Sequence, residues 1–168
     1  MRLPGLFAVT LAVAAGTCVG ALWATPRLIM DRAIDKIGAV GTNTMLHQGL
    51  PDHRSRTVVR PSPDLAYSTC VFDLAGGPVV IDARVPPGRY WSLSVFDRRT
   101  DNIFSVNDSG VSGGRFRLVL SKDGRDGSLS VPGGKGIALI RILVTDAEDL
   151  AGIDALRRRS TCSATDAR

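Results

Sequence analysis

The pattern of apolar and polar positions divides the chain into a long apolar start and a body of short alternating segments. No charged residue occurs between Leu3 and Pro26, and a helix of that length crosses a bilayer. We predict an uncleaved transmembrane anchor over residues 1–26, with a cleaved secretory signal as the alternative. The apolar stretch is longer than that of most cleaved signals, and the bulky Leu22 lies where cleavage needs a small residue.

After this stretch, apolar residues recur at helical spacing: Leu28, Ile29, Ala33, Ile34, Ile37 and Val40. Over residues 27–60 we predict a helix that leaves the membrane and packs one face on the domain or at the interface, followed by a linker. Gly41–Asn43 ends the helix, and His47 and His53 fall in the irregular stretch that follows. Because no third ligand lies near these histidines, we expect no metal site.

From residue 61 the period changes to two, which is typical of half-buried strands. Trp91, Leu93 and Val95 alternate with polar residues, and turn sequences rich in glycine and proline separate such segments. Gly136–Val144 is the most apolar segment, which predicts a central strand. For residues 61–160 the pattern predicts a mainly β fold, an antiparallel β-sandwich (jelly-roll-like), with the transmembrane helix before it and a helix at its C-terminal end.

Helical spacing returns after the last strand, at Leu150, Ile153 and Leu156. Thr145 and Glu148 have the spacing of a capping box, which predicts a helix from about Asp146 to Arg159. Acidic residues in its first turn and arginines in its last turn complement the helix dipole. Residues 161–168 are predicted to be a loose tail.

Charge and cysteine content narrow the function classes. The net charge is only +5, and the densest basic cluster is Arg157–Arg159 at the end of the predicted helix. Nucleic-acid binding needs a basic face interleaved with aromatic residues or a known module, so we expect no nucleic-acid partner. Among the three cysteines, Cys70 and Cys162 lie outside the apolar segment. In an exported domain they either form a disulfide or remain two separate thiols.

Several ordered blocks resemble a known family: PDLAYSTCVFDLAGGPVVI, GRYWSLSVFD, DNIFSVND and GIALIRILVTDAEDLAGIDALRRR. Over about Pro61 to Arg159 they are similar to the bacterial domain of unknown function 1254. The positions that fit its pattern are Asp64, Tyr67, Ser68, Asp73, Leu74, Gly77, Pro78, Gly88, Arg89, Tyr90, Asp97 and Arg141. Members commonly carry Asn-Arg-Asp before the tyrosine, where this chain has Ser62-Pro63-Asp64.

The resemblance implies a β-sandwich in the cell envelope and no established activity. Many members are longer and carry a companion domain, numbered 1214, on the same chain. This chain resembles a short membrane-anchored form whose companion is a separate protein. Basic residues after the span, such as Arg27 and Arg32, alone favour a cytoplasmic body. The resemblance instead implies a single-pass protein of the bacterial inner membrane with its domain on the periplasmic side.

Three interpretations of function stay open. The first is a membrane-anchored envelope domain that binds or assembles with a partner protein. The second is a small-molecule-binding or hydrolytic domain with a site at the polar strand ends. The candidate ligand-binding residues are Tyr67, Arg89, Tyr90, Asp97, Asn107 and Arg141. The third is a purely structural domain.

Arg141 is central to the second interpretation because it lies inside the most apolar strand. An unpaired buried charge is costly, so Arg141 either forms a structural pair with Asp73 or Asp97 or serves a ligand. No nucleophile–base pair is visible, no cofactor is implied, and whether the chain is an enzyme stays open.

Overall fold

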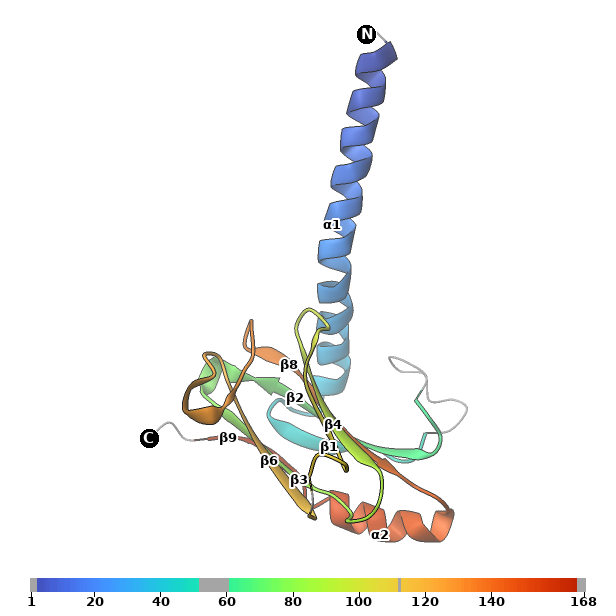
Figure 1. The fold of residues 1–168 in the computed structure, drawn as a ribbon, viewed down its shortest axis with the longest axis vertical. Coiled ribbons are helices and arrows are strands. Elements are labelled where there is room, and N and C mark those ends of the chain that lie inside the picture. The colour runs from blue at the N-terminus through green and yellow to red at the C-terminus, as the bar shows by residue number, and fades with distance from the viewer. Residues whose placement is uncertain (1–2, 52–60, 112, 166–168) are drawn as a thin grey trace.

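The computed structural model describes residues 3–51, 61–111 and 113–165. Its first element, α1 (Leu3–Gly38), is one continuous helix of 36 residues. Figure 1 shows α1 standing away from the β-strands, with the N-terminus at its far end. Within the described chain, α1 is the one helix long and apolar enough to cross a membrane.

Nine strands in the described residues form two stacked sheets (Figure 1). The first sheet has the order β1-β2-β8-β4-β5: β1 (Thr44–His47), β2 (Leu65–Asp73), β8 (Lys135–Leu143), β4 (Trp91–Asp97) and β5 (Asn102–Asn107). The second has the order β7-β6-β3-β9: β7 (Leu129–Ser130), β6 (Arg115–Ser121), β3 (Val79–Arg84) and β9 (Thr161–Ala164). All pairs are antiparallel except β6–β7. Helix α2 (Ala147–Arg157) lies at the end of the body away from α1, and short 3-10 turns occupy Leu74–Gly76 and Arg125–Gly127.

The predicted fold class, a mainly β sandwich with helices at both ends, is confirmed. The inner faces of the sheets form one core around Trp91, Leu93, Ile81 and Leu120, all of which are buried. Cys70 of β2 and Cys162 of β9 are joined by a disulfide across this core, with their Cα atoms 6.3 Å apart. Alternation along the strands places every second residue of the first sheet on its outer face.

The C-terminal part of α1 packs on that outer face. Met30 and Ala33 are buried against Val71 of β2 and Ile137 of β8, with Phe96 of β4 beside them. Arg98, in the turn after β4, donates two hydrogen bonds to Asp31 at 2.8 and 3.0 Å. The helix is therefore held to the sheet by an apolar contact and a bidentate ion pair.

Three local predictions are wrong. Residues 161–164 are not loose but form β9, which pairs with β3. Helix α2 is capped by Asp146, whose carboxylate accepts from the Asp149 amide, and not by Thr145. His47 lies in β1 rather than in an irregular stretch; His53 lies outside the described residues.

Candidate functional site

Backbone pairing brings four polar residues into one line across the first sheet. Tyr67 lies opposite Arg141, Arg141 lies opposite Ser92, and Ser92 lies opposite Asn107. We call these four residues the polar row. Tyr67 is four positions from Val71 along β2, so the row shares the outer face that α1 covers further along the strands.

Arg141 anchors the row through its hydroxyl-bearing neighbours. Its Nη2 donates to Ser94 Oγ at 3.0 Å, and Ser94 Oγ lies 3.4 Å from Ser105 Oγ on β5. Two buried polar atoms beside this contact, Arg141 Nε and Ser92 Oγ, have no hydrogen-bond partner within the described chain. Buried polar groups are almost always paired, so these two atoms mark unused hydrogen-bonding capacity beneath this face. Both are shielded from solvent, and a ligand would reach them only after neighbouring side chains moved.

The ends of the polar row are less buried. The Tyr67 hydroxyl accepts a hydrogen bond from the Ser62 amide at 2.9 Å, which leaves its proton available. Asn107 is exposed, and its Oδ1 accepts from Ser109 Oγ at 2.7 Å. β5 is the outermost strand of the sheet on this side, so the row ends at an open sheet edge.

The other three candidate residues do not join the row. Arg89 forms an ion pair with Asp149 at the start of α2 and donates to the Leu143 carbonyl at 3.3 Å. Tyr90, next to it, is 43% exposed. Asp97 is fully buried at the other end of β4, where it accepts from the Arg99 and Asp101 amides at 2.7 and 3.1 Å. The six candidates therefore do not form one site.

The structure also corrects the predicted partners of Arg141. Asp73 pairs with Lys135 at 2.9 Å, and the hydrogen bond from Lys135 holds the pKa of Asp73 below its usual range. Asp97 pairs with Arg99 at 3.2 Å. Arg141 binds neither acid, because its register places it among serine hydroxyls instead.

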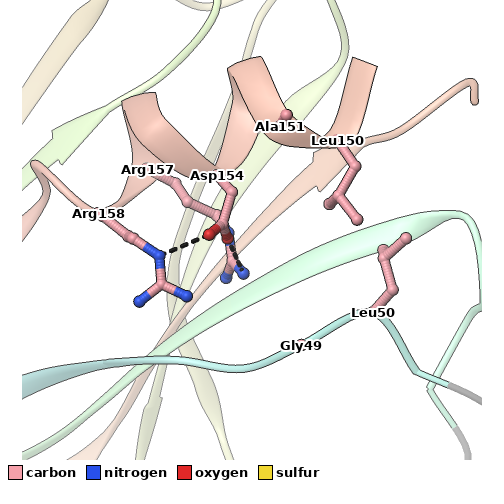
Figure 2. A pocket seen from close by; sticks show the side chains of 7 residues that line it. All are labelled: Gly49, Leu50, Leu150, Ala151, Asp154, Arg157 and Arg158. Atoms are coloured by element: carbon pink, nitrogen blue, oxygen red, sulfur yellow. Dashed lines mark hydrogen bonds and ion pairs between the residues drawn. The ribbon is translucent and has the colours of Figure 1, made fainter. Parts of the chain in front are cut away.

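A small cavity of about 300 Å³ lies between α2 and the segment after β1 (Figure 2). It is lined by Gly49, Leu50, Leu150, Ala151, Asp154, Arg157 and Arg158. Asp154 binds both arginines, and the hydrogen bond from Arg158 is the largest cause that lowers the pKa of its carboxyl.

The role of Arg157 differs from the dipole interaction that its place at the end of a helix predicts. Its side chain is 1% exposed. It donates to the Tyr67 carbonyl at 2.6 Å and to Asp154 Oδ1 at 2.8 Å, and it also binds the Gln48 carbonyl. Arg157 follows Leu150 by seven positions and Ile153 by four, so helical spacing already placed it on the buried face. It is a structural cross-link between α2 and the first sheet.

A serine–histidine pair that the sequence did not reveal lies beside Arg157. His47 Nδ1 and Ser68 Oγ are 2.9 Å apart, on neighbouring strands. Burial, followed by the charges of Arg157 and Arg158, lowers the pKa of His47. Ser68 is 1% exposed and its Oγ also receives a hydrogen bond from Arg157 at 3.3 Å. A substrate therefore has no path to this hydroxyl, and the pair is a packing contact rather than a hydrolytic centre.

Across the described ranges, no three His, Cys, Asp or Glu side chains are arranged to hold a metal ion.

Comparison with protein families matches residues 42–164 to the family described as "Protein of unknown function (DUF1254)". Comparison with curated proteins finds none that matches. The fold is similar to the VPA0106 protein from Vibrio parahaemolyticus, with a TM-score of 0.66 and 12% identity over 86% of this chain and 36% of that one. A putative uncharacterized protein from Burkholderia cenocepacia has a TM-score of 0.50 and 12% identity over 74% of this chain and 35% of that one. This chain thus spans about a third of the length of both.

Proposed function

We propose that this chain, which belongs to the DUF1254 family of proteins of unknown function, is a membrane-tethered envelope module that binds a partner protein. In this proposal α1 anchors it in the bacterial inner membrane and the outer face of the first sheet is the binding surface. The single observation that carries the proposal is the β5 edge of that face, where the polar row ends at the exposed Asn107.

The tether is supported by the apolar half of α1, whose large side chains are exposed; Phe7, for example, is 75% exposed. Such a surface is stable only when lipid or protein covers it. A periplasmic body is supported by the Cys70–Cys162 disulfide, because disulfides persist in oxidising compartments.

The partner is supported by the position of the polar row. The half-buried Arg141 guanidinium and the β5 edge, which pairs only with β4 among the described strands, together suit a polypeptide that brings carboxylates and backbone hydrogen-bonding groups. In the two similar solved structures, the matched part belongs to a longer chain, so there the fold has further protein joined to it. We propose a companion envelope protein of the domain 1214 type as the partner.

The test is site-specific photo-crosslinking in cells with the full chain. A crosslinker at Asn107, at the edge of the polar row, is expected to give one discrete protein adduct. A crosslinker at Arg117, exposed on β6 of the other sheet, is the matched control and should not give it. Arg141→Gln should lower the Asn107 adduct by about tenfold or more, because a hydrogen-bonded charge contact is lost. Equal adduct yields from Asn107 and Arg117 would contradict the proposal. So would an Asn107 adduct whose yield is unchanged by Arg141→Gln.

A small anion is the second candidate ligand, since the Arg141 guanidinium is only partly buried and can bind one carboxylate. The purified full chain in detergent would then show a raised Tm with acetate or succinate, and Arg141→Gln would abolish the rise. If the anions do not raise the Tm and the Asn107 crosslink is observed, the ligand is the protein partner and not a small anion.

A further inference from the structure

A second cleft, of about 500 Å³, lies beside α1 and involves none of the polar row. Helix α1 lines it with Trp23, Arg27 and Asp31. Arg98 and Arg99 come from the turn between β4 and β5, and Pro132 and Gly133 precede β8. In Figure 1 the turn between β4 and β5 rises beside α1.

The position of the cleft along α1 sets its depth in a membrane. The uncharged stretch from Leu3 to Pro26 matches the hydrocarbon thickness of a bilayer, about 30 Å. Trp23 lies near the end of this stretch and is 64% exposed, the location that tryptophan prefers at membrane interfaces. Arg27 is the first charge after it and stacks on the Trp23 ring, 4.0 Å from the ring centroid. The cleft therefore lies at the level of the lipid head groups.

The charges that line the cleft leave one cation unneutralised. The Asp31 carboxylate accepts hydrogen bonds from Nε and Nη2 of Arg98, so these two charges compensate each other. Arg99 pairs with Asp97 at 3.2 Å and with Asp101 at 3.3 Å, yet its side chain stays 49% exposed. Arg27 has no acidic partner within the described chain; its contacts are the ring and the carbonyl of Trp23. A guanidinium that faces a cleft at head-group depth is suited to a phosphate.

We propose that this cleft binds the head-group phosphate of an anionic phospholipid, with Arg27 as the main donor and Arg99 as the second. The inference rests on the membrane tether of the proposed function but not on the protein partner. Its consequence is that a bound lipid fixes the depth and orientation of the β-sandwich at the membrane surface.

The test uses the full chain in nanodiscs with equal parts of phosphatidylcholine and phosphatidylglycerol, released intact in a mass spectrometer. The wild type is expected to retain phosphatidylglycerol in preference to phosphatidylcholine. Arg27→Gln combined with Arg99→Gln should lower this retention by about tenfold or more, because each arginine near an anionic surface strengthens binding several-fold. Arg158→Gln, on an exposed arginine at the end of α2, is the matched control and should retain lipid as the wild type does.

Two outcomes would overturn the lipid assignment: equal retention of both lipids, or unchanged retention in the double variant with a wild-type near-ultraviolet circular dichroism spectrum. Loss of the lipid on addition of inorganic phosphate alone would also overturn it, because the site would then select free phosphate. Extraction of the chain from membranes by alkaline carbonate separates the two proposals. If the chain is released, the tether itself fails; if it stays embedded and shows no lipid preference, only this inference fails.

Discussion

At the end of α2, Arg157 holds a buried positive charge among acceptors from β2, from the segment after β1 and from α2 itself. A charge that is 1% exposed is tolerated only when its donors are satisfied. Arg157 meets this condition with the carbonyls of Gln48 and Tyr67 and with Asp154. These contacts join α2 to the chain around β1 and β2, segments far apart in the sequence.

Replacement of Arg157 by leucine should therefore destabilise the domain by about 2–4 kcal/mol, since buried carbonyls lose their donors. Urea unfolding of the full chain in detergent, followed through the fluorescence of the buried Trp91, measures this loss. Arg158→Gln removes an exposed partner of the same Asp154 and should cost less than about 1 kcal/mol. Equal losses of unfolding free energy in Arg157→Leu and Arg158→Gln would show that the buried contacts of Arg157 do not stabilise the domain.

His47 gives the stability a pH dependence near neutrality. Burial lowers its folded-state pKa below the usual value of 6.5, so the unfolded chain takes up the proton first. The stability contributed by neutral His47 is thus complete well above pH 6.5 and falls as the pH drops through that value. In urea unfolding, the wild type should lose stability between about pH 7.5 and 5.5, and His47→Gln should remove that part of the slope. The pKa values of Asp73 and Asp154 are lowered from 3.8, so these acids act in a separate, more acidic window. An identical slope in the variant would refute the assignment to His47.

At the residue scale, the sequence identified Arg141 as a buried charge in need of partners but named the wrong ones. The choice depends on strand pairing: β8 lies next to β4, which places Arg141 beside Ser92 and Ser94 rather than near an acid. Nothing in the alternation of a strand says which strands become its neighbours. The burial of Arg157 was predictable from its spacing of four residues to Ile153. Its positive charge instead suggested a side chain exposed to solvent at the end of the helix.

At the scale of elements, β8 is the strand around which the first sheet forms, since it pairs along its whole length with β2 and along seven residues with β4. Its apolar sequence predicted this central place correctly. β9 was not predictable in the same way, because a polar four-residue segment has no recognisable period. It becomes a strand through pairing with β3 and the bond at Cys162.

The start of β8 requires a glycine. A Cβ on Gly136 would lie 2.1 Å from the Phe96 carbonyl oxygen and 2.7 Å from the Phe72 ring. Gly136→Ala should therefore separate the strands and cost more than about 4 kcal/mol, seen as loss of soluble folded protein or a collapse in Tm. The control is Gly152→Ala in α2, where a Cβ meets nothing within 4 Å and the helix should gain up to about 1 kcal/mol. Similar Tm values for both variants would contradict this account of β8.

At the scale of the whole molecule, the disulfide between Cys70 and Cys162 closes a loop of the chain with a sequence separation of 92. Cys162→Ser should lower the unfolding free energy by about 2–5 kcal/mol, because the unfolded chain regains the freedom that the bond removes. Alkylation of the chain isolated from cells should modify one thiol, Cys18, before reduction and all three afterwards. Three modified thiols without reduction would show that the bond is absent in the cell.

The sequence predicted the apolar span, the sandwich and the continuation of the first helix past the apolar span. It did not predict which part of the body receives that helix. The contact joins Asp31 to Arg98 and Ala33 to Val71 and Ile137, pairs that become neighbours only after the sheet has formed. The orientation of the body relative to α1 is thus a property of the folded molecule and has no local signature.

The docking of α1 makes a final prediction about this orientation. Ala33 is 6% exposed in the contact with Val71 and Ile137, whereas the Asp31–Arg98 pair is exposed and holds the helix less firmly. Ala33→Gln should therefore release α1, because a longer polar side chain does not fit this apolar contact. Spin labels on the native Cys18 and on Arg117→Cys report the distance from the helix to the β-sandwich by pulsed electron resonance. The distance distribution should be narrow in the wild type and in the exposed control Arg32→Gln, and broad in Ala33→Gln. A broad distribution in the wild type would mean that the helix is a flexible tether rather than a rigid support.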